Sequence, residues 1–332
     1  MRVQDAPHVE PGPRLPKPAV GWPELAALAL LVVVLLPAPY KASLASPGLR
    51  NWITIFVAIS VQALPFLVLG TLVSGAIAAA VPPGWLARHL PKRPGLAVPA
   101  AGLAGAAFPG CECGSVPIAG RLVANGAQPA AATAFLLSAP AINPVVLVST
   151  AVAFPGQPQY VVARFAGSLA TAVVVGLIWS RVGKAAWHAK ALGRISVGDT
   201  RWRTMAATSL HDFLHAGGFL IVGAITAATL HTVVPQSVLS TIAGSGLLAV
   251  LIMALLAFVL AICSEADAFV AASLSQFSPT ARLAFMVVGP AVDVKLVALQ
   301  AGTFGRSFAT RFAPISFVVA VVCSLVAGRF LL

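Results

Sequence analysis

The stretch FPGCECGSVP, residues 108–117, decides the fold of this chain, because it interrupts an apolar segment near residues 96–124. Two prolines, two glycines and a glutamate stand in a run that is otherwise apolar enough to enter a bilayer, and proline removes a backbone donor from a helix. A second apolar segment, near residues 244–275, is interrupted by CSEAD, residues 263–267. We therefore expect two broken membrane segments, each either one long crossing or two half-length helices folded as a re-entrant hairpin.

The composition around these breaks is that of a membrane protein. Hydrophobic residues make up 59% of the 332 residues and charged residues only 9%, whereas soluble domains carry about a quarter charged residues. This excludes an ordinary soluble domain and a disordered chain. The excess of 21 Lys and Arg over nine Asp and Glu is typical of cytosolic loops on such a background. We expect an all-α integral protein of the cell membrane that contacts the lipid bilayer and has no nucleic-acid partner.

Apolar runs of about 20 residues mark spanning helices. With Pro, Gly and charge clusters as their ends, these runs lie near 22–40, 52–81, 130–153, 159–181, 208–232, 283–300 and 311–332. The count is about 7–9 spanning helices plus the two broken segments. The first run follows a Pro-rich polar tail that contains Asp5 and Glu10, so we interpret it as a transmembrane helix, with a cleaved signal segment as the alternative.

The charges of the loops predict the orientation. The loops at 82–95 and 181–207 are rich in Lys and Arg, so the positive-inside rule places both in the cytosol. Because helices 130–153 and 159–181 contribute two crossings between these loops, residues 96–124 must contribute an even number, as a re-entrant hairpin does. With this choice the N-terminus and the 181–207 loop are cytoplasmic.

The two halves of the chain repeat each other with an offset of 150 residues. The matched pairs are Cys113 and Cys263, Pro129 and Pro279, Phe135 and Phe285, Pro140 and Pro290, and Asn143 and Asp293. Helices 52–81 and 208–232 run in opposite directions under the orientation above, so we expect inverted repeats, the pattern of a secondary transporter. The alternative is a duplicated scaffold without transport. The expected organisation is a tail at 1–21, a first transmembrane helix at 22–40, membrane repeats at 51–181 and 208–332, and a basic cytoplasmic linker at 182–207.

Five of the nine acidic residues lie inside apolar segments, where a charge costs at least about 2.5–3.5 kcal/mol and marks a cavity, a partner or a pathway. They are Glu112, Asp212, Glu265, Asp267 and Asp293. We interpret all of them except Asp212 as candidates for ion or proton coupling. For Asp293 the structural alternative is an ion pair with Lys295, Arg121 or Arg164.

The cysteines are the second chemical signal. Cys111 and Cys113 flank Glu112, and Cys263 is the repeat equivalent of Cys113, so three thiols could meet between the halves. Thiolates bind soft or borderline species such as Cu(I), Zn(II) or, by the same logic, trivalent arsenic. Because a closed three-thiolate cage would release its solute too slowly for transport, we expect one or two thiols to engage at a time. The alternative is that these cysteines are small buried hydrophobes, as we expect for Cys323.

Two further sets of polar residues stand in apolar segments. Asn143 lies in PAINP, residues 140–144, where a proline frees a backbone carbonyl, so it is a candidate for substrate binding, with a simple kink as the alternative. His211 and His215 lie one turn apart on one helix face and are candidates for a metal pair or a proton relay, with an interfacial role as the alternative.

The segments GCECGSVP (110–117) and PAINP (140–144), with their echoes in the second half, resemble the predicted permease family that includes the ArsP methylarsenite exporters. The resemblance extends from about residue 50 to the C-terminus. It implies a multi-pass permease, with organoarsenical efflux as the activity of some members. It also implies that Cys111 and Cys113 correspond to the family's cysteine pair and handle a trivalent arsenical.

These signals predict a secondary permease, not an enzyme, that exports a soft thiol-reactive solute with proton coupling through the buried acids. A transition-metal permease, a membrane thiol–disulfide protein and a structural subunit of a larger complex are the alternatives. The chain has no Walker A pattern, and no cofactor is expected. The expected partners are a small-molecule or ion substrate and the bilayer, and assembly with further copies of the chain is left open.

Overall fold

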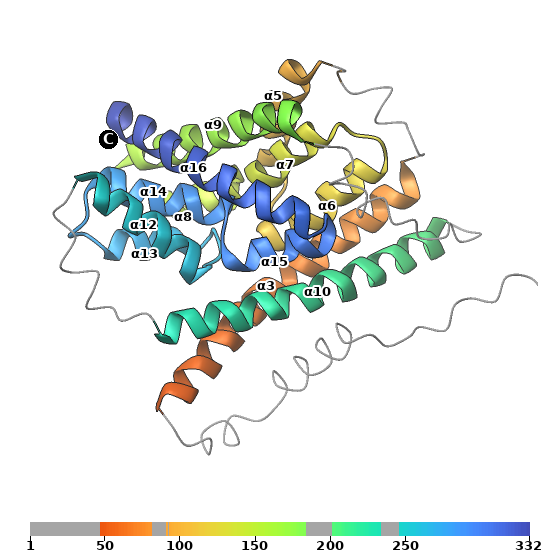
Figure 1. The fold of residues 1–332 in the computed structure, drawn as a ribbon, viewed down its shortest axis with the longest axis horizontal. Coiled ribbons are helices and arrows are strands. Elements are labelled where there is room, and N and C mark those ends of the chain that lie inside the picture. The colour runs from red at the N-terminus through yellow and green to blue at the C-terminus, as the bar shows by residue number, and fades with distance from the viewer. Residues whose placement is uncertain (1–46, 82–90, 92, 184–200, 234–245) are drawn as a thin grey trace, which may run out of the picture.

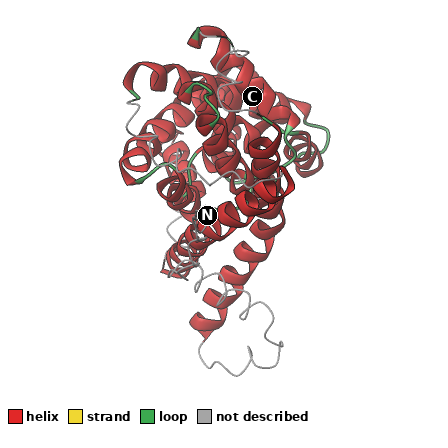
Figure 2. Ribbon diagram, turned by 90° about the vertical axis from the view of Figure 1, so that its right-hand side faces the viewer, coloured by secondary structure: helices red, strands yellow, loops and turns green. Residues whose placement is uncertain are grey.

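The computed structural model describes residues 47–81, 91, 93–183, 201–233 and 246–332. Within these ranges the regular elements are all helices, as Figure 2 shows, which confirms the predicted all-α fold. The predicted tail at 1–21 and the first predicted helix at 22–40 lie outside the described residues.

The helices of the first half follow one another with short connections (Figure 1). They are α3 (Pro47–Ala80), α5 (Pro94–Ala104), the 3-10 helix η1 (Gly105–Ala107), α6 (Glu112–Ala124), α7 (Pro129–Ile142), α8 (Pro144–Ala153) and α9 (Pro158–Val182).

The second half has a matching order of elements. They are α10 (Arg201–Val233), α12 (Gly246–Leu260), α13 (Asp267–Ser273), α14 (Pro279–Ala291), α15 (Val294–Thr303) and α16 (Arg306–Leu331).

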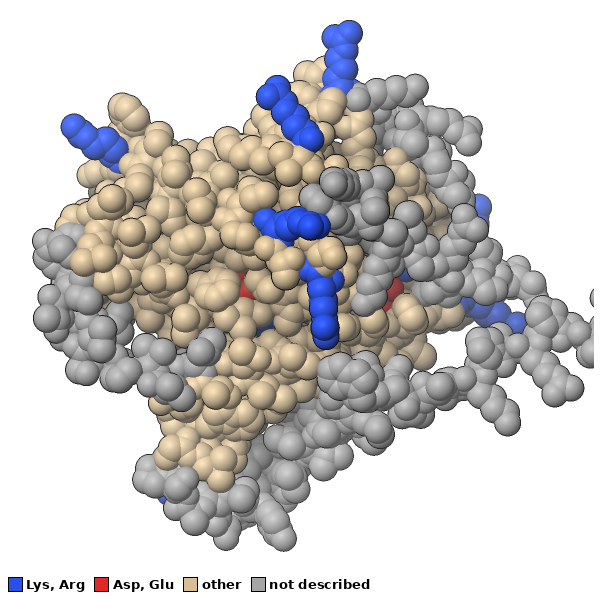
Figure 3. Space-filling model, in the orientation of Figure 1, with Lys and Arg blue, Asp and Glu red and all other residues tan. Residues whose placement is uncertain are grey.

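Six segments of the described chain are long and apolar enough to cross a membrane. They are Gly48–Ala80, Pro129–Ala153, Pro158–Val182, Arg201–Thr229, Pro279–Thr303 and Arg306–Leu331. Each overlaps one of the predicted apolar runs, so the sequence located these spans correctly. On the face drawn in Figure 3 most of the drawn surface is uncharged, with basic side chains at its edges and near its middle. A multi-pass membrane protein is the class of structure that these spans support.

The spans predicted at 130–153 and 283–300 are present as candidate membrane spans, and each consists of two helices. The first divides into α7 and α8 at Asn143, and the second into α14 and α15 at Val292 and Asp293. Asn143 precedes a proline, which disfavours the helical conformation, and its Oδ1 accepts a hydrogen bond from the Val146 N–H at 3.0 Å. Asp293 caps α15 in the same way, with 2.5 Å from the Leu296 N–H to Oδ1.

The helix boundaries agree with the offset of 150 residues. Helices α8 and α15 begin at residues 144 and 294 and end at residues 153 and 303, and α7 and α14 begin at Pro129 and Pro279. The packing partners also correspond, since α7 contacts α5 and α9 while α14 contacts α12 and α16. The opposite orientation of the two halves in the membrane stays a prediction.

The broken helix pairs form the interior of the molecule. In the most apolar part of Pro129–Ala153 and of Pro279–Thr303, 72% and 83% of the residues are buried, against 28% for Gly48–Ala80. Helices α3 and α10 run side by side and extend beyond the rest of the bundle (Figures 1 and 2). Packing also crosses between the halves, because α15 contacts α6 and α13 contacts α8. The two breaks are therefore held by helices of the opposite half.

Candidate functional site

Two interrupted segments form the framework of the site. The first break, residues 108–111, lies between η1 and α6, and the second break, residues 261–266, lies between α12 and α13. Ala261 at the start of the second break has φ +48°, and it is the described non-glycine residue with a positive φ. A side chain in this conformation is uncommon and costs energy, and such residues concentrate at functional sites.

The structure brings the three predicted thiols together. The Cys111 thiol lies near the thiols of Cys113 and Cys263, and all three side chains are fully or almost fully buried. Ligand atoms of Cys111, Glu112 and Cys113 lie within 4.8 Å of one another. None of the three cysteines forms a disulfide. We call these three residues the thiol cluster; it joins a break of the first half to a break of the second.

A buried ion pair adjoins the thiol cluster. The Nζ atom of Lys295, near the start of α15, lies 2.5 Å from Oε1 of Glu112 and 3.6 Å from Sγ of Cys263. It also donates to the Ala261 carbonyl at 3.3 Å. Ser264 Oγ donates to the second carboxylate oxygen of Glu112 at 3.4 Å. Both members of the pair are almost completely buried, so the charges are balanced within the protein.

A second buried ion pair holds the second break. Arg164, on α9, donates through Nη2 to Oδ2 of Asp267 at 2.8 Å and to the Ser264 carbonyl at 3.0 Å. Its Nη1 donates to Oγ1 of Thr150, on α8, at 2.9 Å. A basic residue of each half therefore neutralises an acid at the break of the other half.

The other two predicted coupling acids have carboxylate oxygens without a hydrogen-bond partner in the structure. In Glu265, at the second break, both oxygens are of this kind. In Asp293, Oδ1 caps α15 while Oδ2 has no partner. The structural alternative for Asp293, an ion pair with Lys295, Arg121 or Arg164, is not formed. Each of these basic side chains pairs with a different acid.

Asn143 lies beside the first break, and its polar atoms bind the backbone. Its Nδ2 donates to the carbonyls of Gly110 at 3.1 Å and Ala139 at 2.8 Å, and its Oδ1 caps α8. The side chain thus fixes the first break to the junction of α7 and α8. The contacts of Asn143 are therefore structural, whereas the sequence suggested that this residue binds substrate.

His211 and His215 belong to a different set of contacts. Their rings stack with centroids 5.9 Å apart, and Nε2 of His215 lies 3.1 Å from the Gly302 carbonyl. Asp212 between them pairs with Arg121 at 3.2 Å and accepts from Ser74 at 2.5 Å. The group of metal-ligand type found among the described residues is Cys111, Glu112 and Cys113, without Cys263 and without either histidine.

A cavity of about 410 Å³ borders the first break. Residues of α3, α5, α6 and α7 line it, and its wall is almost entirely apolar. Phe108 forms part of this wall and also lies against Gly110 and Gly114, so its ring separates the cavity from the backbone that carries the thiols. The cavity is an apolar space next to the site.

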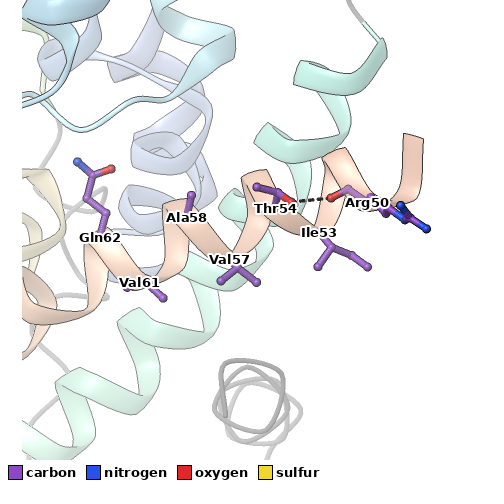
Figure 4. A pocket seen from close by; sticks show the side chains of 7 residues that line it. All are labelled: Arg50, Ile53, Thr54, Val57, Ala58, Val61 and Gln62. Atoms are coloured by element: carbon purple, nitrogen blue, oxygen red, sulfur yellow. Dashed lines mark hydrogen bonds between the residues drawn. The ribbon is translucent and has the colours of Figure 1, made fainter. Parts of the chain in front are cut away.

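A larger groove of about 630 Å³ lies along α3 alone, as Figure 4 shows. Residues from Arg50 to Gln62 line it, and the hydrogen bond drawn there runs from Thr54 Oγ1 to the Arg50 carbonyl at 2.8 Å. The described residues that line it include no thiol, carboxylate or imidazole. We therefore place the candidate site at the thiol cluster and not in this groove.

The sequence predicted that Arg121, Arg164 and Lys295 pair with buried acids but did not identify the right partners. Asp293 was the acid named for them, whereas Lys295 binds Glu112 and Arg164 binds Asp267. Burying a lysine or an arginine in a membrane helix costs as much free energy as burying an acid. These two basic residues could therefore have been predicted as part of the site. Nothing in the sequence indicated that the backbone carbonyl of Ala261 accepts a hydrogen bond from Lys295.

Comparisons with known proteins agree on one class. A family model described as "Predicted permease" matches residues 48–329. The UPF0718 protein YcgR of Bacillus subtilis is 37% identical over 279 residues, which cover 81% of this chain and 93% of that protein. A protein of Streptococcus mutans named "Putative two-component membrane permease complex subunit" is 32% identical over 291 residues, which cover 83% of this chain and 94% of that protein. No solved structure gives a significant match.

Proposed function

This chain belongs to the predicted permease family, and from that membership we propose that it is a secondary permease that exports a soft, thiol-reactive solute such as a trivalent organoarsenical. The observation that carries the proposal is the thiol cluster. Buried cysteines of both halves lie at the two helix breaks, and many secondary transporters bind their solutes at such interrupted helices. Membership of a permease family supports a transporter rather than an enzyme.

The chemistry of the cluster suits a neutral trivalent arsenical. An arsenical of the form R–As(OH)₂ condenses with two thiols to give R–As(S–Cys)₂, with two As–O bonds broken, two As–S bonds formed and two water molecules released. Cys111 lies next to both other thiols, so a two-thiol adduct can form with either of them. Hydrolysis reverses the step and releases the solute without a change of oxidation state.

Proton coupling is the second part of the proposal, and we assign it to Asp293. Burying a carboxylate with one oxygen unpartnered costs several kcal/mol while it is charged, and a proton removes that cost. Glu112 and Asp267 are already neutralised by basic residues, and Glu265 is only partly buried, so none of these three is the first choice for this role.

A transition-metal permease is the second candidate. The observation that favours it is the set of ligand atoms from Cys111, Glu112 and Cys113 within 4.8 Å of one another. Thiolate and carboxylate together suit Zn(II) or, with the thiols alone, Cu(I).

Assembly with a second membrane subunit is a further proposal, drawn from the name of the Streptococcus mutans relative. Native mass spectrometry of this chain purified together with candidate partners, in lipid nanodiscs, tests it. A defined stoichiometry with one partner supports the proposal, and a chain that transports alone contradicts it.

Uptake into everted membrane vesicles tests the function itself. Vesicles with the wild-type chain are compared for methylarsenite, arsenite, Zn(II) and Cu(I), with and without a proton gradient. Cys111→Ser with Cys113→Ser should abolish methylarsenite uptake, whereas Cys263→Ser alone should lower it, because Cys111 and Cys113 can still form a two-thiol adduct. Cys323→Ser is the matched control, because that thiol lies in α16 beside Thr171 and outside the thiol cluster. Zn(II) uptake that needs the same cysteines, without methylarsenite uptake, would make the metal permease the better conclusion.

A further inference from the structure

The Lys295 ammonium group lies in a setting that resembles a cation-binding site. Its three contacts are a carboxylate oxygen of Glu112, the backbone carbonyl of Ala261 and the sulfur of Cys263. An ammonium group has three N–H donors, and three acceptors of different kinds surround it here. Oxygen and sulfur donors at these positions are also what a bound metal cation would use.

The backbone holds this ammonium in place. Lys295 is in the first turn of α15, directly after the Asp293 cap. Helix α10 presses against the same point, because a Cβ added to Gly223 would lie 2.7 Å from Cα of Lys295. On the other side, the uncommon conformation of Ala261 accompanies a carbonyl that faces Nζ. The ammonium is buried and fixed, whereas lysines near the end of a membrane helix usually extend toward water.

Stability does not explain a buried ion pair of this kind. Replacing both members of such a pair by apolar residues is often neutral or stabilising, because the desolvation cost of two charges is large. Lys295 also has a position that a purely structural counter-ion would not need, since it touches the thiol cluster as well as the acid. The contact with sulfur points to a role toward the solute.

We propose that the Lys295 ammonium group, held beside Glu112 and Cys263, takes the place that a metal cation would occupy next to the thiol cluster and Glu112. The site therefore rejects metal cations and accepts neutral thiol-reactive solutes. The proposal rests on the function proposed above and decides between its two candidates. A neutral arsenical exchanges two hydroxides for two thiols without changing the net charge, so Lys295 can stay beside Glu112. A divalent metal ion must either displace the ammonium from Glu112 or lie a few ångströms from a fixed positive charge, and both are strongly unfavourable in a buried site.

Metal and arsenical binding by the full chain in lipid nanodiscs test the proposal. After equilibrium dialysis against Zn(II) alone or methylarsenite alone, the molar ratios of zinc and arsenic to protein are measured. Wild type should bind methylarsenite and no stoichiometric Zn(II). Lys295→Met should gain a Zn(II) site at least about 100-fold tighter than any in wild type, and the gain should disappear when Cys111 and Cys113 are also replaced by serine.

Two matched variants test whether Zn(II) is excluded by a positive charge at position 295 in particular or by any buried positive charge. Lys295→Arg keeps a cation beside the thiols and should keep Zn(II) out. Arg164→Met removes an equally buried cation at the Asp267 pair and should not create a Zn(II) site on the cysteines. The double variant Glu112→Gln with Lys295→Met, which leaves no unpaired charge, should bind Zn(II) more weakly than Lys295→Met but more tightly than wild type.

The outcomes are distinguishable from failure of the proposed function. If wild type binds one Zn(II) through Cys111 and Cys113, Lys295 does not exclude cations and the proposal is overturned, whether or not the variants fold. Equal Zn(II) binding by Lys295→Arg and Lys295→Met also overturns it. If wild type binds no methylarsenite but Lys295→Met gains Zn(II), the role of Lys295 stands and the arsenical function fails.

Discussion

The Nζ atom of Lys295 lies 2.5 Å from Oε1 of Glu112, so the second half of the chain supplies the counter-ion for the acid between the two cysteines of the first. Arg164 and Asp267 repeat this arrangement in the opposite direction. Each half thus forms a buried ion pair with the break of the other half, and an unpaired charge there would be strongly unfavourable. Any movement that separates the halves must break or re-pair these charges.

The first prediction concerns the stability of the Glu112 and Lys295 pair. Glu112→Gln should lower the free energy of unfolding by about 3–5 kcal/mol, because it leaves a buried ammonium without its carboxylate. Adding Lys295→Met should restore most of the loss. Chemical unfolding in mixed micelles measures both.

A partly exposed pair is the matched control for this cycle. The side chains of Arg121 and Asp212 are 13% and 17% exposed, so Asp212→Asn should cost at most about 1 kcal/mol. Additive losses in the double variant of Glu112 and Lys295 would show that the two charges do not depend on each other.

The second prediction is that lysine cannot replace Arg164. The guanidinium reaches Asp267, the Ser264 carbonyl and Thr150 at once, and a lysine ammonium is a point charge that cannot span these three acceptors. Arg164→Lys should therefore cost about 1–3 kcal/mol of stability. Unfolding in micelles measures the loss, and Arg282→Lys, outside this network, is the comparison. Full stability of Arg164→Lys would contradict the importance of the three-way contact.

The third prediction concerns the contact between α3 and α6. A Cβ added to Gly70 would collide with the backbone of Gly114, so the two helices approach as closely as they do only because neither residue has a side chain. Gly70→Ala should destabilise the protein by about 1–3 kcal/mol and reduce transport, because it moves α6 and Cys111, which directly precedes it. Thermal unfolding and vesicle uptake measure the two effects.

Gly217 in α10 provides the control for this substitution. A Cβ there would lie 3.8 Å from the nearest side-chain atom, in Leu67, which is ordinary van der Waals contact. Gly217→Ala should leave stability unchanged or raise it by up to about 1 kcal/mol, since alanine favours helix. An equal loss from both substitutions would show that the close approach at Gly70 is not the cause.

The fourth prediction tests the inverted orientation of the halves. Cysteines introduced at Gln128, between α6 and α7, and at Gln276, after α13, should react with a membrane-impermeant maleimide from opposite sides of the membrane. Labelling of intact cells and of everted vesicles in a Cys323→Ser background measures this, because the remaining native thiols are buried. Reaction of both positions from one side would rule out inverted repeats.

Much of this architecture could be predicted from the sequence, because apolar length and prolines act locally. The spans and the two breaks follow from residues within a few positions of each other. The division of two spans at Asn143 and Asp293 was anticipated only as a proline kink, because a capping side chain competes with an apolar run that looks continuous. A residue that can cap a helix, standing near a proline, would have predicted these helix ends.

The partners of the charged residues could not be derived in the same way. Asp293 and Lys295 are neighbours in the sequence, yet the cap turns Asp293 toward the backbone while Lys295 reaches Glu112. Which buried acid meets which buried base depends on how α15 packs against α6, a contact between the two halves. Local pattern carries no information about that packing.

The last prediction uses the correspondence between Asn143 and Asp293. Both side chains cap a helix through Oδ1, but the second oxygen of Asp293 has no partner, whereas Nδ2 of Asn143 donates to two carbonyls. Asp293→Asn keeps the cap and removes the group that can carry a proton. It should change stability by less than about 1 kcal/mol, since the acceptor for the Leu296 N–H is retained.

Transport by this variant should separate coupling from solute handling. Uptake of methylarsenite driven by a proton gradient should fall at least about tenfold, while exchange of labelled for unlabelled methylarsenite at equilibrium should persist, because the thiols are intact. Asn143→Asp is the reciprocal control. It also keeps a cap but loses both donations and buries a carboxylate, so it should destabilise the protein by about 2–4 kcal/mol. If proton-driven uptake survives in Asp293→Asn, the coupling proton is carried elsewhere, and the unpartnered oxygen of Asp293 then has no part in transport.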